Sequence, residues 1–184
     1  MNLRKIQLPV LFFIRLSVIV LPLFLLSCGN NEKVKKADNF DYKTSLENAN
    51  KKLVRTEEQE IESYISRYQL EMNKTGSGLR YLIYKNGNGA FVRKGDLVKL
   101  KFKAGLINGT ECYNSEKDGI KQFEIGKSGV ESGLEEGILL LHKGDKAKFI
   151  IPSHLAFGLL GDENKIPKRA TLIYDVELIE VKIK

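Results

Sequence analysis

The chain has 184 residues, which leaves room for one ordinary domain with short attachments. Hydrophobic residues at 42% suffice for a core, and charged residues at 29% suit a solvated surface. Of the net charge of +7, three positive charges (Arg4, Lys5 and Arg15) lie in the first 27 residues, which contain no acid, so the rest carries +4. This excess is spread along the chain and forms no basic stripe beside aromatics, which argues against nucleic-acid binding.

Cysteine and histidine are scarce, and their spacing matches neither a zinc site nor a CxxC redox pair. The two cysteines are Cys28 and Cys112, and the two histidines are His142 and His154. Two cysteines could form a disulfide, but Cys28 lies in a segment whose pattern predicts a different modification, described next. We expect solvated histidines, no metal and no cofactor.

The first residues have the pattern of an export signal. Arg4 and Lys5 precede an apolar run whose uninterrupted part, residues 16–26, has 11 residues, too short to span a bilayer. The following Ser27-Cys28-Gly29 resembles the bacterial lipobox, in which a small residue precedes a cysteine that receives lipid. The alternative is an uncleaved anchor helix. Asn30 and Asn31 replace the Asp that would indicate inner-membrane retention. We therefore expect a lipoprotein that faces the periplasm, in the outer membrane.

A polar segment from Gly29 to about Thr44 predicts a flexible spacer. Thr56 with Gln59 three residues later has the form of a capping box, and apolar residues then recur at helical spacing. We expect a helix over about 57–72. Its apolar face consists of Ile61, Tyr64, Ile65, Tyr68 and Met72. This face could pack on the following domain or contact a second copy or a partner, and the oligomeric state is left open.

From residue 79 onward the apolar period changes from helical to two, the period of β-strands. Asn108-Gly109 is a strong hairpin signal between two of the strands. Strands are expected near 79–84, 98–102, 110–113, 123–125, 146–151 and 171–183, with a short helix within 130–141. The fold class is therefore α+β, with an antiparallel sheet wrapped around a short helix and preceded by the N-terminal helix and signal peptide.

Seven short motifs occur in this domain in one order, and together they resemble the FK506-binding-protein (FKBP) family of peptidyl-prolyl isomerases. The motifs are Asn108-Gly109-Thr110, Glu124-Ile125-Gly126, Gly133-Leu134-Glu135-Glu136-Gly137, Lys143-Gly144-Asp145-Lys146-Ala147, Ile151-Pro152 with Ala156-Phe157-Gly158, Ile166-Pro167 with Ala170-Thr171-Leu172, and Tyr174-Asp175-Val176-Glu177-Leu178. Together with the lipobox and the helix, they are also similar to gliding-motility-associated lipoproteins of that family. The expected divisions are 1–27 signal peptide, 28–55 lipidated tether, 56–78 helix and linker, and 79–184 isomerase domain.

The resemblance implies a site that binds the proline ring of a substrate. Its expected catalytic residues are Phe102, Phe157, Tyr174 and Leu134, the last as the floor where the family commonly has Trp. Its expected substrate-binding residues are Tyr113, Val130, Ile166 and Glu131, the last through its backbone N–H. Without the resemblance, simple core packing would explain each of them.

The chain also departs from the family at the site. Cys112 and Tyr113 stand where an aromatic and an Asp are usual, Lys121 replaces another aromatic, and Phe157 lacks a hydroxyl often found there. We expect an isomerase of weak to moderate activity on proline-containing exported polypeptides, with poor macrolide binding. The alternatives are a non-catalytic chaperone or partner-binding module and a structural lipoprotein with a vestigial pocket.

Overall fold

The computed structural model describes residues 42–127 and 129–183. The chain divides into two compact units, residues 1–44 and 45–184, and the contacts below lie within the second. The expected signal peptide and Cys28 lie outside the described residues. None of the described helices is long and apolar enough to cross a membrane.

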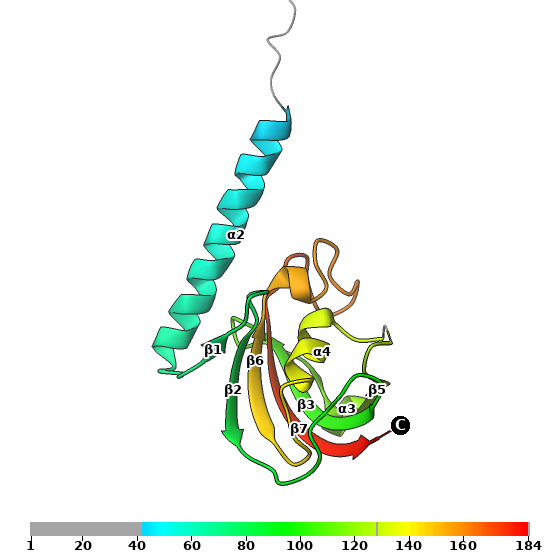
Figure 1. Cartoon of the computed structure of the whole chain (residues 1–184). Helices are drawn as coiled ribbons and strands as arrows, with labels where there is room; N and C mark the ends of the chain where they lie inside the picture. Colours follow the sequence, from blue (N-terminus) through cyan, green and yellow to red (C-terminus); the bar gives the residue numbers. More distant parts are fainter. Residues whose placement is uncertain (1–41, 128, 184) are drawn as a thin grey trace, which may run out of the picture. The chain divides into compact units, whose positions relative to one another are not determined.

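The domain is a seven-stranded sheet in which all recorded strand pairs are antiparallel, with the short helix α4 against one face (Figure 1). The strand order is β1-β2-β6-β7-β3-β4, and β5 also pairs with β3. The elements are β1 (Asn73–Lys74), β2 (Arg80–Lys85), β3 (Leu97–Leu106), β4 (Glu111–Asn114), α3 (Ser115–Asp118), β5 (Lys121–Glu124), α4 (Ser132–Ile138), β6 (Lys146–Ile151), η2 (Ser153–Leu155) and β7 (Leu172–Lys182). The predicted fold class is confirmed.

Alternation along the two longest strands fills the core. Over residues 98–104 of β3 and 172–178 of β7 every second side chain is buried, and five of the six intervening side chains are charged and half-buried or exposed. The buried set is Val98, Leu100, Phe102 and Ala104 on β3, and Leu172, Tyr174, Val176 and Leu178 on β7. These side chains belong to one hydrophobic cluster with α4 and β6, so a single core supports the sheet and the helix.

Close approach of α4 to the sheet depends on two glycines. A Cβ on Gly133 would lie 2.4 Å from Cγ2 of Ile151, and one on Gly137 would lie 2.8 Å from Cζ of Phe149. Both distances are far below a normal contact, so only glycine lets the helix pack this closely. The close packing leaves Leu134, between the two glycines, with no exposed surface.

The expected start of the N-terminal helix is wrong. Helix α2 runs Tyr42–Arg67, so it begins well before Thr56 and ends before Met72. Thr56 is not a cap, because its hydroxyl donates to the carbonyl of Lys52 one turn earlier, at 3.0 Å. The described residues of the expected tether, 42–55, are therefore helical, and Asn73–Lys74, expected as a break, forms β1.

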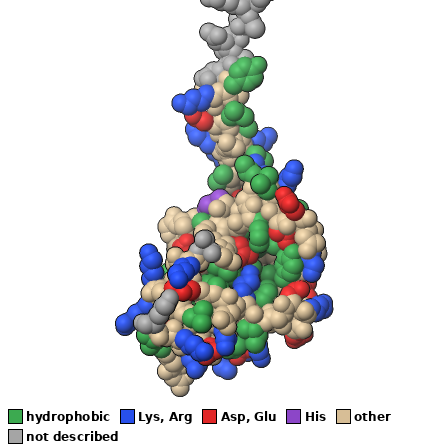
Figure 2. Space-filling model, turned by 90° about the vertical axis from the view of Figure 1, so that its right-hand side faces the viewer, with side chains coloured by type: hydrophobic (Ala, Val, Ile, Leu, Met, Phe, Trp, Pro, Cys, Tyr) green, Lys and Arg blue, Asp and Glu red, His purple; other side chains and the backbone are tan. Residues whose placement is uncertain are grey.

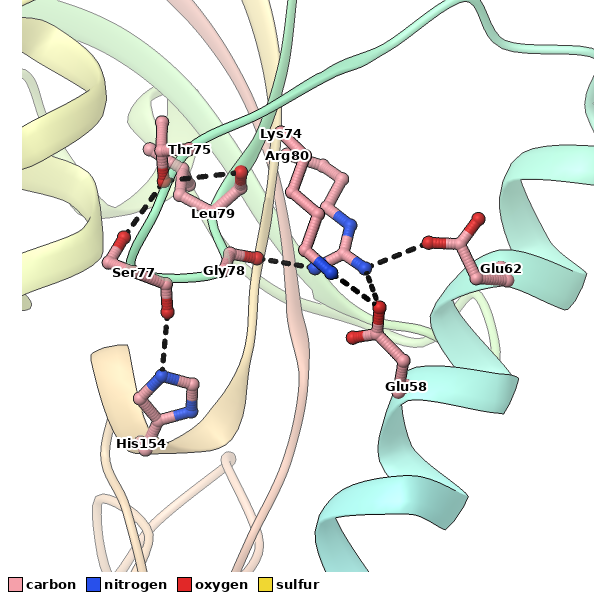
Figure 3. Close-up of polar contacts among 9 residues, drawn as sticks. All are labelled: Glu58, Glu62, Lys74, Thr75, Ser77, Gly78, Leu79, Arg80 and His154. Atoms are coloured by element: carbon pink, nitrogen blue, oxygen red, sulfur yellow. Dashed lines mark hydrogen bonds and ion pairs between the residues drawn. The ribbon is translucent and has the colours of Figure 1, made fainter.

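Carboxylates of α2 fasten the helix to the domain. The buried guanidinium of Arg80 on β2 lies between Glu58 and Glu62 and donates to both, to Glu62 at 2.8 Å (Figure 3). Lys74 pairs with Glu58 at 2.7 Å. Hydrogen bonding from Lys74, opposed by burial and reinforced by Arg80, lowers the pKa of Glu58. Of the predicted apolar face, Ile61 is buried while Tyr68 is exposed, so the helix packs on the domain through polar as well as apolar groups.

Glu57 makes the most extensive of these helix contacts. Its carboxylate accepts from the backbone N–H of Ser153 at 2.6 Å, from the Ser153 hydroxyl at 3.0 Å and from the Thr171 hydroxyl at 2.7 Å. Ser153 and Thr171 are themselves buried, so these donors depend on Glu57 rather than on water.

Replacing Glu57 with Ala should therefore lower the free energy of unfolding by about 1–3 kcal/mol, because buried donors lose their acceptor. Urea denaturation of the chain measures the loss. Glu60→Ala is the matched control, since Glu60 is exposed on the same helix, and its effect should stay within about 0.5 kcal/mol. Equal effects of the two substitutions would show that the Glu57 contacts do not stabilise the domain.

Candidate active site

The site forms where one edge of β3 is left open. On that edge β5 pairs with residues 97–100 of β3 and β4 pairs with residues 103–105, with α3 between the two strands. Phe102 lies in the gap, and its backbone N–H donates to the hydroxyl of Ser115 at 3.2 Å instead of to a strand. The sheet edge therefore opens beside an aromatic side chain.

A cavity of about 500 Å³ lies at this opening. Its walls come from β3, β4, α3, β5, the residue that precedes α4, the loop after η2, and β7. The lining residues are Phe102, Tyr113, Asp118, Gly119, Ile120, Lys121, Glu131, Phe157, Asp162, Asn164 and Tyr174. Its volume is typical of a site for a small ligand or a short peptide segment.

Five of the eight predicted site residues line this cavity. They are Phe102, Tyr113, Glu131, Phe157 and Tyr174. The Phe102 and Tyr174 rings are 6.0 Å apart between centroids, in a tilted arrangement usual for aromatic pairs. The structure therefore brings these predicted aromatic residues together at one cavity, while their roles in binding and catalysis stay predictions.

The other three do not line the cavity. Leu134, expected as the floor, is fully buried in the core because its helix packs tightly on the sheet. Ile166 is buried in the same core, and Val130 is half-buried against it. Leu134 has no exposed surface and is absent from the lining, so the structure places it in the core and not at the floor of the cavity.

The Glu131 side chain is an unexpected part of the site. Glu131 occupies the N-cap position of α4, but its carboxylate does not cap the helix. Oε1 accepts from the Tyr174 hydroxyl at 2.6 Å, whereas Oε2 is buried without a hydrogen-bond partner in the described part of the chain. Burial, followed by the adjacent Glu131 charge, raises the pKa of Tyr174, which keeps this phenol a hydrogen-bond donor.

Lys121 supplies the charge opposite Glu131. Its Nζ lies 3.6 Å from Glu131 Oε2, 5.1 Å from the centroid of the Phe102 ring and 5.7 Å from that of Tyr174. An ammonium over aromatic faces is attracted by their quadrupoles. The cavity thus contains a cation, a buried carboxylate and two aromatic rings in mutual contact.

A second polar group lies at the other side of the cavity. The Tyr113 hydroxyl donates to Asp162, which also accepts from the backbone N–H groups of Asn164 at 2.9 Å and Ile166 at 2.7 Å. Burial opposes ionisation of Asp162, but these hydrogen bonds outweigh it and lower its pKa. The hydrogen bond to Asp162 raises the pKa of Tyr113. This carboxylate orders the loop after η2 around the cavity.

Only part of this arrangement of charged groups could be predicted from the sequence. The resemblance marks Lys121 as a departure from an aromatic position, but the sequence does not predict that it lies near Glu131, because residues ten positions apart in a strand and a loop have no predictable geometry. Asp162 lies in a loop, where pattern carries little information. Among the described residues, no group of three or more His, Cys, Asp or Glu could hold a metal ion.

Comparison with known proteins agrees with this geometry. The family model for FKBP-type peptidyl-prolyl cis-trans isomerase matches residues 89–179. The crystal structure of AtFKBP13 is similar with a TM-score of 0.57 and 30% identity, over 61% of this chain and 99% of that one. The chain belongs to the FKBP-type peptidyl-prolyl cis-trans isomerase family. The domain thus has the FKBP-like fold that the sequence motifs imply.

Bacterial members of the FKBP family are also similar. FkpA of Escherichia coli strain K12 is 39% identical over 110 residues, which cover 59% of this chain and 40% of that protein. FkpA of Buchnera aphidicola from Acyrthosiphon pisum is 38% identical over 110 residues, 60% of this chain and 45% of that protein. The crystal structure of E. coli FkpA has a TM-score of 0.62 and 28% identity over 91% of this chain and 81% of that one. The aligned part spans less than half of the length of these FkpA sequences.

The Tyr174–Glu131 hydrogen bond provides a test of how the cavity is held. Tyr174→Phe should lower the free energy of unfolding by about 1–3 kcal/mol, because a buried carboxylate loses its hydroxyl donor. Thermal or urea unfolding measures it, with Tyr68→Phe on α2 as the control, because that ring is 56% exposed. A loss no larger than that of the control would contradict a stabilising role for this bond.

Proposed function

We propose that this chain is a peptidyl-prolyl cis-trans isomerase that acts on proline-containing segments of exported polypeptides. The observation that carries the proposal is the convergence of Phe102, Tyr113, Phe157 and Tyr174 on one cavity, in a domain of the FKBP family. An aromatic hollow of this kind fits a proline ring, which is compact, apolar and rigid.

The reaction needs no nucleophile and no general base. Rotation about the X–Pro bond is slow because resonance holds the amide planar, with a barrier of ~18–20 kcal/mol. An enzyme accelerates it by binding the twisted amide more tightly than either planar form. A thousandfold acceleration corresponds to about 4 kcal/mol. Because twisting reduces charge separation in the amide, aromatic walls disfavour the twisted form less than the planar ones.

A Phe157→Ala variant tests whether the cavity performs this reaction. We expect kcat/KM for a short proline peptide to fall by about tenfold, as the loss of one ring wall removes about 1.4 kcal/mol of differential binding. Protease-coupled cis/trans kinetics on the parent chain and the variant measure it. Phe91→Ala is the control, because Phe91 is 45% exposed and packs on His142, outside the cavity lining. Equal kcat/KM values for the parent chain and Phe157→Ala would show that the cavity does not catalyse the isomerisation.

The site also offers an argument for a second function, a non-catalytic module that holds polypeptides. Lys121 and Glu131 place two charges in a cavity where resemblance leads us to expect mostly aromatic walls. Figure 2 shows one face of the domain, where hydrophobic side chains are mixed with acidic and basic ones rather than gathered in one apolar patch. Suppression of a client's aggregation by a chain that leaves peptide isomerisation unaccelerated would favour this second function.

The proposal extends to the location of the chain. The supporting feature is the signal-like segment that ends at Ser27-Cys28-Gly29, which resembles a lipobox. A thiolate is nucleophilic enough to take a lipid group, and several acyl chains on Cys28 would give stable anchoring. The domain would then act from the periplasmic face of the outer membrane, with a narrower similarity to gliding-motility lipoproteins.

Lipidation at Cys28 has a direct test in the bacterial host. Labelled palmitate should be incorporated into the chain, and Cys28→Ala should abolish the label and move the protein from the membrane to the soluble fraction. Cys112→Ala is the control, because Cys112 is buried in the domain and should leave labelling unchanged. Label that persists in Cys28→Ala would refute the anchor.

A further inference from the structure

The amide that precedes proline offers its binding site only an acceptor. Proline has no backbone N–H, so the X–Pro linkage presents its carbonyl oxygen and no donor. Placing that oxygen in a largely apolar cavity without a donor would leave it unsatisfied, at a cost of about 1–3 kcal/mol. The cavity must therefore supply donors to the carbonyl groups of a bound peptide. The backbone N–H of Glu131 is expected to serve one carbonyl, so a second donor must come from a side chain of the lining.

Most polar side chains that line the cavity are already engaged or cannot donate. Tyr174 donates to Glu131, Tyr113 donates to Asp162, and the Asn164 amide reaches the Tyr113 hydroxyl at 3.3 Å. The three carboxylates of the lining accept only. Among the described side chains of the lining, this leaves the second N–H of Asn164 and the ammonium of Lys121. Of these two donors, only the ammonium is charged and lies over the Phe102 and Tyr174 rings.

The ammonium of Lys121 has N–H groups without an acceptor among the described residues, and its position is restricted. At 3.6 Å its ion pair with Glu131 is longer than a hydrogen bond, and its Nζ has no closer acceptor among the described residues. The Lys121 side chain is 27% exposed, whereas that of its ion-pair partner Glu131 is only 4% exposed. The ammonium is therefore accessible from the open side of the cavity while its partner is buried. The Phe102 and Tyr174 rings beneath it restrict where the ammonium lies.

We propose that Lys121 is a substrate-contacting residue that donates a hydrogen bond to the carbonyl oxygen of the residue before proline, and that Glu131 is its positioning residue. This rests on the proposed isomerase function and adds the group that recognises the peptide. The unpartnered Oε2 of Glu131 holds the ammonium electrostatically while leaving its N–H groups for the ligand.

The chemistry of the amide sets which kinetic constant responds. In the planar amide, resonance places negative charge on the carbonyl oxygen, and twisting withdraws it. A cationic donor at that oxygen therefore binds the planar substrate at least as well as the transition state. Such an interaction lowers KM and does not raise kcat.

The experiment compares Lys121→Met and Lys121→Arg with the parent chain, using NMR exchange on a short proline peptide to obtain Kd, kcat and KM. We expect Lys121→Met to raise Kd and KM about three- to tenfold, as for one partly exposed charge-assisted hydrogen bond, with kcat unchanged or slightly higher. Lys121→Arg should restore most of the affinity. Lys127→Met, which removes an equal charge outside the lining, should leave all three constants unchanged.

A double-mutant cycle tests the role of Glu131. Glu131→Gln keeps an acceptor for Tyr174 but removes the charge, so it should weaken peptide binding in the parent chain and have no further effect in the Lys121→Met background. An equal effect in both backgrounds would show that Glu131 does not act through Lys121. Urea unfolding of each variant checks folding, and Lys121→Gln replaces any Met variant that unfolds.

The outcomes separate this inference from the proposed function. Unchanged Kd in Lys121→Met, or tighter binding as expected if the ammonium merely plugs the cavity, overturns the role of Lys121 while leaving catalysis by the parent intact. If the parent chain binds the peptide but does not isomerise it, the proposed isomerase function is wrong. The Kd values of the variants still test whether Lys121 binds the peptide. A parent that neither binds nor isomerises the peptide overturns both.

Discussion

The antiparallel pairing of β3 with β7 determines both the core and the site. In this ladder Phe102 lies opposite Val176 and Ala104 lies opposite Tyr174, so Phe102 and Tyr174 are diagonal neighbours on the inner face. Diagonal positions are within reach of aromatic rings, which explains the 6.0 Å between their centroids. A slip of one residue would turn every inward side chain of one strand to solvent. The register that buries the core therefore also assembles the cavity walls.

The charges in the cavity are a departure that the fold tolerates at a cost. Burying a carboxylate is unfavourable unless hydrogen bonds and an opposite charge compensate for it. Glu131 has one strong hydrogen bond, from Tyr174, and one long ion pair, with Lys121, so its compensation is incomplete. A buried charge whose burial cost is only partly compensated is typical of functional sites. An apolar side chain at the same position would make the domain more stable. The network is thus better explained by ligand recognition than by stability.

The sheet and the aromatic walls of the cavity could be predicted from the sequence, because both depend on alternation and ordered motifs. The strand 146–151 was predicted with its observed ends, and five of eight site residues line the cavity. Prediction failed where the answer depends on contacts between distant segments. Leu134 is buried because two glycines bring α4 against the sheet, and Arg80 is buried because α2 supplies two carboxylates. The early start of α2 was not predicted because its first turns are mostly exposed and have only scattered apolar residues, which form no continuous helical stripe.

The polar attachment of α2 explains why a long helix with several exposed apolar side chains can still have a defined place on the domain. Glu57, Glu58 and Glu62 lie within two turns, so they face the domain together and meet Ser153, Thr171 and Arg80 there. Ser153 precedes the loop that carries Phe157, and Thr171 precedes the strand that carries Tyr174. Glu57, one of the carboxylates that anchor α2, thus also fixes the ends of two segments that form the cavity walls. Loss of the helix should therefore loosen the site even though no residue of α2 lines it.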